Sequence, residues 1–246
     1  MKGWVRILAG CLVVIMALGA GMAHADVIDV TAWDAGWYHI SGYHNADNRD
    51  YAAGCVYEEG WLLRDFFIFD IDTGLGTITA AQLVLYEPAD GYASPGGSET
   101  FNVTAPTAYS ASQIATAHGH ADAEGQGIYA DLAAATGIGT ATITSSTTGY
   151  DVTIDLDSAI LSAIAASAGS KWVAGGYLTL PDQPTADEYV FANTADWPFE
   201  HHAPILRLTT TGDTPPPPPP PPIPEPATLA LLGGALLGLA RRRRRK

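Results

Sequence analysis

The sequence has very little cysteine. Its 246 residues include only Cys11 and Cys55. If Cys11 is removed with an N-terminal leader, Cys55 has no partner for an internal disulfide, so the fold must be held together by its core. Because Cys55 lies between two tyrosines in a strand-like stretch, we interpret it as a small buried apolar residue and not as a nucleophile.

Basic side chains are almost missing from the middle of the chain. Between residues 26 and 214, only Arg49, Arg64, Lys171 and Arg207 are basic, whereas all but one of the 26 acidic side chains lie there. Affinity for nucleic acid depends on a basic surface. The composition therefore excludes a nucleic-acid partner for this segment and leaves cations, polysaccharides and proteins as partners.

Long apolar runs occur only at the two ends, which excludes a polytopic membrane protein. Residues 1–25 have the order of a signal peptide: a basic start, an apolar stretch, and a small-x-small cleavage site formed by Ala23 and Ala25. A lipoprotein box ending at Cys11 is the alternative. It fits poorly, because only four residues separate Cys11 from Arg6 and the apolar run continues beyond the cysteine.

The C-terminal end has a linker, a tripeptide, an apolar stretch and a basic terminus. The linker, residues 211–223, contains eight consecutive prolines, which form a stiff polyproline II rod. Pro224, Glu225 and Pro226 follow. The apolar stretch, 227–240, is about 21 Å long as a helix, shorter than the roughly 30 Å hydrocarbon core of a bilayer.

The basic terminus comes directly after the apolar stretch and consists of Arg241, Arg242, Arg243, Arg244, Arg245 and Lys246. By the positive-inside rule these side chains stay in the cytoplasm. Together with the signal peptide, they predict that the acidic segment is exported and that the short helix is a transient membrane segment.

Residues 224–246 resemble the PEP-CTERM sorting signal of Gram-negative bacteria, with tripeptide, short helix and arginine-rich end in the family's order. In that family an integral-membrane exosortase cuts near the motif. The resemblance implies transient anchoring in the inner membrane, a final place at the cell surface or in the extracellular matrix, and a link with exopolysaccharide and biofilm. An ordinary tail anchor would explain the helix and the arginines but not the tripeptide.

Residues 26–210 alternate strand-like runs with Gly, Pro, Asn and Asp breaks. About ten short strands of this kind predict an all-β domain, a two-sheet sandwich of jelly-roll type. The strands are expected at 27–31, 37–40, 61–71, 80–87, 100–104, 141–144, 151–157, 172–180, 188–191 and 205–210. Short helices are expected at 110–117 and 159–168, and a long surface loop at 118–139.

Part of this domain is similar to a recurrent ectodomain of PEP-CTERM proteins. The residues that carry the similarity are 64–70 and 77–83, and residues 188–191 are similar to its later segment. This resemblance supports an all-β ectodomain and assigns no activity to it.

Motifs for catalysis are missing. The sequence contains no Gly-x-Ser-x-Gly elbow, phosphate-binding loop or His-Glu-x-x-His motif. A glycoside hydrolase needs two acids on facing strands, and such pairs arise by chance in so acidic a segment. The nearest pairs are Glu58 and Glu59, Asp70 and Asp72, and Asp187 and Glu188. We therefore expect no enzyme activity and keep a surface glycan hydrolase as the least favoured alternative.

Metal ligands show no zinc spacing, so we predict no transition-metal site among the histidines 39, 44, 118, 120, 201 and 202. The oxygen-rich run of Asp47, Asn48 and Asp50 makes a structural Ca²⁺ conceivable. No other cofactor is expected.

Aromatic side chains gather near both ends of the domain. Trp33, Trp37 and Trp197 are candidate glycan contacts, because aromatic faces stack on the apolar faces of sugar rings. The alternative is that they are ordinary core and rim residues. The sequence thus favours a structural or adhesive surface protein, with a lectin-like module as the second hypothesis.

Overall fold

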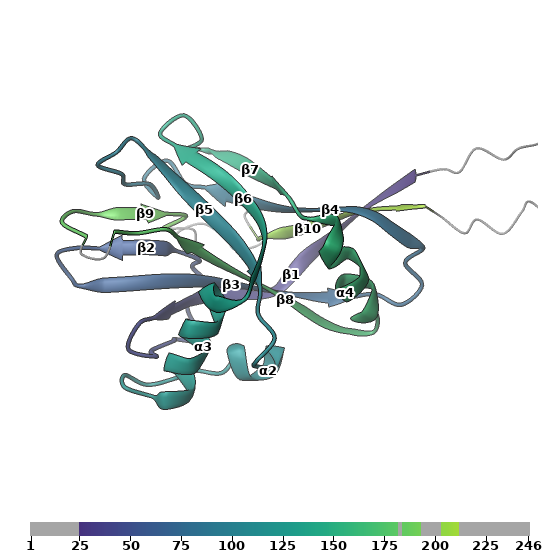
Figure 1. The fold of residues 1–246 in the computed structure, drawn as a ribbon, viewed down its shortest axis with the longest axis horizontal. Helices are drawn as coiled ribbons and strands as arrows, with labels where there is room; N and C mark the ends of the chain where they lie inside the picture. Colours follow the sequence, from purple (N-terminus) through teal and green to yellow (C-terminus); the bar gives the residue numbers. More distant parts are fainter. Residues whose placement is uncertain (1–24, 182–183, 193–202, 212–246) are drawn as a thin grey trace, which may run out of the picture. The chain divides into compact units, whose positions relative to one another are not determined.

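The computed structural model describes residues 25–181, 184–192 and 203–211, and in these ranges the chain is mostly β-strand (Figure 1). The all-β prediction is confirmed. The strands are β1 (Ala25–His39), β2 (Ala53–Val56), β3 (Trp61–Ile71), β4 (Thr77–Glu87), β5 (Ser98–Ala105), β6 (Thr136–Thr144), β7 (Tyr150–Asp155), β8 (Ser170–Leu178), β9 (Glu188–Val190) and β10 (Ile205–Thr211). The helices are α2 (Ala111–Ile114), α3 (Ala123–Ala134), the 3₁₀ turn η1 (Ser158–Ile160) and α4 (Leu161–Ala166).

Strand β3 lies at the centre of the sheet, as its uninterrupted apolar sequence predicted. Phe66, Phe67, Ile68 and Phe69 are all fully buried, because alternate residues of a strand point to opposite faces and both faces are covered. Phe67 and Phe69 pack in the main core on one face of the sheet, and Phe66 and Ile68 pack on the other face with residues of α2 and α3.

The strands pair in one antiparallel path, in the order β6-β5-β8-β3-β1-β10-β4-β7, and β2 adds to β3 and β9 to β2. Strand β1 connects the strands β6-β5-β8-β3 with the strands β10-β4-β7. Its first part pairs with β10 and its second part with β3, with a bulge between Ala32 and Asp34. A β-bulge bends a strand and increases its twist, so one long strand can serve both halves where the sequence predicted two short strands.

The sheet curls back on itself until its outer strands approach each other. The N–H of Asp157, just after β7, donates to the carbonyl of Ile138 in β6 at 2.7 Å. The strand order thus gives a continuous, nearly closed sheet, and it does not confirm the jelly-roll sandwich, which stays a prediction.

The predicted surface loop at 118–139 is wrong. The segment contains helix α3, which packs on β1, β3 and β8, followed by the first residues of β6. Asp122 caps this helix by accepting the N–H of Gly125 at 3.0 Å. The two glycines inside the helix pack closely: a Cβ on Gly125 would overlap the carbonyl oxygen of Gly42, and a Cβ on Gly127 would overlap the Tyr109 hydroxyl. Composition alone cannot show such a contact.

The two predicted short helices are present. Ser110 caps α2 in a capping box with Gln113, and Gly169, with φ +76°, follows the η1–α4 segment in a left-handed conformation. Strand β2 was not among the ten expected strands, but it lies in the strand-like stretch around Cys55, which is buried as its interpretation as a small apolar residue predicted.

Candidate functional site

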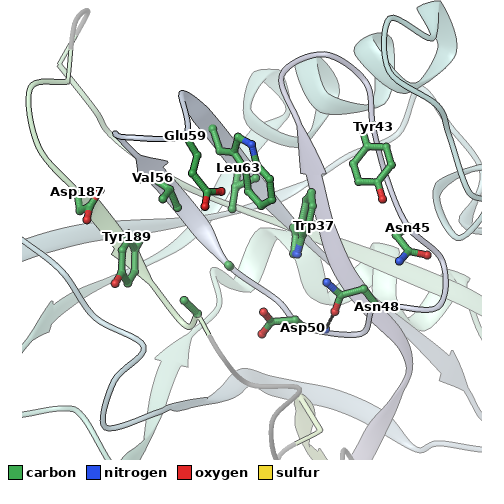
Figure 2. Close-up of a pocket in the computed structure, with 13 residues that line it drawn as sticks. Trp37, Tyr43, Asn45, Asn48, Asp50, Val56, Glu59, Leu63, Asp187 and Tyr189 are labelled. Atoms are coloured by element: carbon green, nitrogen blue, oxygen red, sulfur yellow. Dashed lines mark hydrogen bonds between the residues drawn. The ribbon is translucent and has the colours of Figure 1, made fainter.

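An open groove of about 450 Å³ lies where β1, β2 and β3 meet the loop that follows β1 and the strand β9 (Figure 2). Trp37 comes from β1 and Leu63 from the adjacent strand β3, Val56 is the last residue of β2, and Ala52 directly precedes β2. The groove is therefore built on paired strands, and its rim is contributed by loops.

Three aromatic rings form a row in this groove. The ring centroid of Trp37 is 5.8 Å from that of Trp61 and 6.0 Å from that of Tyr43, with tilted planes. Trp37 is 7% exposed and forms the floor, whereas Trp61 is 40% exposed and offers its ring to solvent. Tyr43 is fixed from behind by His120, whose ring stacks on it at 4.5 Å.

Polar side chains surround the row. Figure 2 shows Glu59 and Asp187 to one side of Trp37 and Asn45 and Asn48 to the other. Asp187 is held in place, because its Oδ1 accepts the N–H of Tyr57 at 2.8 Å. Carboxylates accept hydrogen bonds and amides both donate and accept them, so this rim can bind a ligand rich in hydroxyl groups.

The predicted glycan contacts are only partly brought together. Trp37 lies in the groove, Trp33 does not line it, and Trp197 lies outside the described residues. Trp33 falls at the β1 bulge, where the Lys171 ammonium lies 3.8 Å from its ring centroid. Sequence reasoning missed Trp61. Trp61 is the first residue of β3, and an aromatic residue at the end of a strand, next to a loop, was the feature of the sequence that could have indicated an exposed ring.

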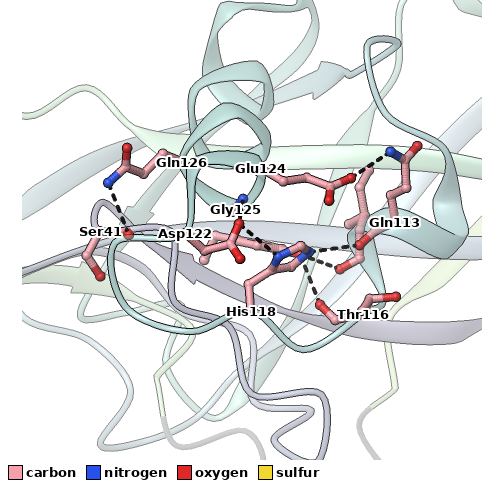
Figure 3. A network of polar contacts seen from close by, with 10 residues as sticks. Ser41, Gln113, Thr116, His118, Asp122, Glu124, Gly125 and Gln126 are labelled. Carbon is pink, nitrogen blue, oxygen red and sulfur yellow. Dashed lines mark hydrogen bonds and ion pairs between the residues drawn. The ribbon is translucent and has the colours of Figure 1, made fainter.

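A second polar network ties helices α2 and α3 to the loop after β1 (Figure 3). His118 Nδ1 lies 3.3 Å from Asp122 Oδ1, and the backbones of His118 and His44 pair as an isolated β-bridge. His44 is buried, and its Nδ1 donates to the Trp37 carbonyl at 3.0 Å. Burial lowers the pKa of His44 to about 4. These contacts position the loop that carries Tyr43 and Asn45.

Two acidic residues, Asp65 and Glu87, are completely buried in the described part of the chain, and their burial was not predicted. Asp65 is fully buried, and neither of its carboxyl oxygens has a hydrogen-bond partner among the described residues. Burial raises its pKa well above the ordinary value, with Asp50 and Glu87 adding repulsion. Burial also raises the pKa of Glu87 to about 8, although its oxygens accept the N–H of Phe191.

The remaining predicted groups are separated. Among the described residues, no three or more histidine, cysteine or acidic side chains are arranged to hold a metal ion. Asn48 uses its side-chain oxygen to accept the N–H of Asp50 in a turn, and the Ca²⁺ expectation for Asp47, Asn48 and Asp50 stays untested.

The acidic pairs considered for glycan hydrolysis lie in different places. Asp70 forms an ion pair with Lys171, whereas Glu59 and Asp187 both line the groove.

The predicted processing sites lie almost wholly outside the described residues. Ala25 begins β1 and pairs with Thr211, and Ala23 precedes the described range, so the signal peptide stays a prediction. The tripeptide 224–226, the apolar stretch 227–240 and the basic terminus 241–246 are also outside it. Within the part of the chain that is described, no helix is long and apolar enough to cross a bilayer.

Comparison with known proteins bears on the C-terminus of the chain. No curated protein matches the chain, so the resemblance of the β domain to a recurrent ectodomain stays a prediction. Residues 222–245 match the family model of the PEP-CTERM protein-sorting motif, as Pro224, Glu225 and Pro226 predicted, and the chain therefore carries a sorting motif consistent with an exosortase substrate.

Proposed function

We propose that the protein is exported through the inner membrane, held there briefly by residues 227–246, and processed by an exosortase at Pro224-Glu225-Pro226. It then resides at the cell surface or in the extracellular matrix. The β domain has a structural or adhesive role linked to exopolysaccharide or biofilm and catalyses no reaction of its own. The match of residues 222–245 to the sorting motif carries this proposal.

The charge of the domain supports a matrix role. With so few basic side chains between residues 26 and 214, copies of the protein repel one another and stay soluble at high local concentration. The sequence places eight consecutive prolines between the domain and the sorting motif, and a run of this composition is expected to serve as a spacer for the membrane enzyme.

Replacing Glu225 tests the sorting proposal. In a host that encodes an exosortase, we expect the wild type in the medium or outer surface fraction, and Glu225→Ala in the inner-membrane fraction with its tail uncut. Glu58→Ala, an exposed acid of the β domain, is the matched control and should be sorted as the wild type. Release of Glu225→Ala with wild-type mass and yield would contradict the proposal.

A carbohydrate-binding module is the second candidate function, and the aromatic groove favours it. A glycan hydrolase acting through Glu59 and Asp187 is a third and weaker candidate. Incubation with host exopolysaccharide distinguishes the last two, since only a hydrolase creates new reducing ends.

A further inference from the structure

We propose that the groove around Trp37, Tyr43 and Trp61 binds a stretch of neutral polysaccharide and excludes uronic-acid polymers. This inference rests on the carbohydrate-binding candidate above, and it does not depend on processing of the tail. It names the site and the class of sugar, and it places Trp61, not Trp33, at the contact.

The aromatic row supplies the stacking surface. An aromatic face carries partial negative charge and attracts the weakly positive C–H groups on one face of a pyranose ring. Trp61 is 40% exposed, so a ligand that covers its ring removes apolar surface from water, and Trp37 beside it is already fixed by packing. Because His120 stacks on Tyr43, that ring is held before any ligand binds, which lowers the entropy lost on binding.

The rim favours hydroxyl groups. The side-chain oxygens of Asn45 and Asn48 already accept backbone N–H groups within their loop, so these two residues offer their amide N–H donors, and Glu59 and Asp187 offer acceptors. Neighbouring hydroxyls of a sugar both donate and accept, and they match this mixture. The volume of about 450 Å³ lies within the usual range of roughly 300–1,000 Å³ for sites of small ligands.

The charge of the rim sets the class of sugar. In the described part of its lining the groove has the carboxylates Asp50, Glu59 and Asp187 and no lysine or arginine. A uronate carboxylate placed among them would be repelled at short range and would find no cation to pair with. A neutral chain meets no such repulsion. The groove is thus suited to an uncharged glycan although the whole domain is acidic.

An organic cation is the other ligand that aromatic rings and carboxylates can hold. The two asparagines argue against it, because their N–H groups gain nothing from an ammonium ligand, which has no acceptor. The experiment therefore includes choline as a comparison.

Affinity electrophoresis of the purified full-length chain in mild detergent tests the proposal. Native gels contain galactomannan, xyloglucan, dextran or polygalacturonate. We expect retardation in at least one neutral gel and none in polygalacturonate. Trp61→Ala should lose the retardation, with the dissociation constant for that polysaccharide raised at least tenfold. Trp33→Ala, which removes an equally exposed tryptophan outside the groove, should be retarded as the wild type.

Circular dichroism and the melting temperature show that both variants are folded. The proposal is overturned if no neutral gel retards the wild type, if polygalacturonate retards it as strongly, or if Trp61→Ala behaves as the wild type. It is also overturned if choline alone binds, seen as a change in tryptophan fluorescence. The sorting of the tail is measured in a separate experiment, in cells. None of these binding results therefore decides whether the exosortase proposal is correct.

Discussion

Glu87 accepts the backbone N–H of Phe191 with both carboxyl oxygens, each 3.1 Å away, across 104 residues of chain. Glu87 ends β4, and Phe191 follows β9 with φ 59°, a left-handed conformation that is uncommon for a bulky residue. The carboxyl group thus holds the turn after β9 against the core, where the Phe191 ring meets that of Phe101 at 5.0 Å.

The protonation of Glu87 makes stability depend on pH. Burial raises its pKa from 4.5 to about 8. Between these values the folded state keeps a proton that the unfolded state has lost, so this contribution is complete below pH 4.5 and disappears as pH rises through 8. In urea unfolding, Glu87→Gln should lose less stability than the wild type between pH 5 and pH 8.5, by on the order of 3 kcal/mol. Glu58→Gln, an exposed acid, should keep the wild-type slope, and an unchanged slope in Glu87→Gln would contradict the prediction.

His44 has the opposite effect at acid pH. Burial lowers its pKa from 6.5 to about 4. The unfolded state binds a proton first as pH falls, so stability is present above 6.5 and is lost progressively toward pH 4. His44→Gln should reduce this acid loss by about 2 kcal/mol, whatever its effect on stability at pH 7. Urea titrations at pH 7 and pH 4.5 measure the difference, with the exposed His120→Gln as control.

Gly125 should not tolerate alanine, although alanine normally stabilises a helix interior by roughly 1 kcal/mol relative to glycine. Its Cβ would overlap the Gly42 carbonyl oxygen, and Gly42 has φ +88° and cannot move easily. We expect Gly125→Ala to lower the melting temperature by several degrees, about 1–3 kcal/mol. Gly119→Ala, where no atom lies within 4 Å of the added Cβ, is the control and should melt as the wild type.

Periodicity in the sequence predicted the elements whose burial follows a simple rule. Strand β3 was placed at its observed bounds, because an unbroken run of large apolar residues must be covered on both faces. In β7, Val152 and Ile154 point inward, as the alternation predicted. The short helices predicted within 110–117 and 159–168 are present, with Ser110 capping the first and Gly169 following the second. Helix α3 was missed because its glycines are explained only by what packs against them.

The site was less predictable, because its residues are brought together by packing between segments that are distant in the sequence. Trp37 and Trp33 are close in the sequence and looked equivalent, yet the bulge at Ala32 and Asp34 separates them in space. Trp61, Glu59 and Asp187 meet only because β2 pairs with both β3 and β9. Asp65 looked like an ordinary acid at a strand position, and only the packing around it shows that it is buried.

The sequence by itself identified the sorting motif and showed that the domain is built of strands. Those properties depend on local patterns: a contiguous tripeptide, a short apolar stretch, a basic end, and alternation within single strands. The tertiary structure decided which aromatic rings share a groove and which acidic side chains are buried away from solvent. Both depend on contacts between residues far apart in the chain, and no local sequence pattern specifies which of these residues meet.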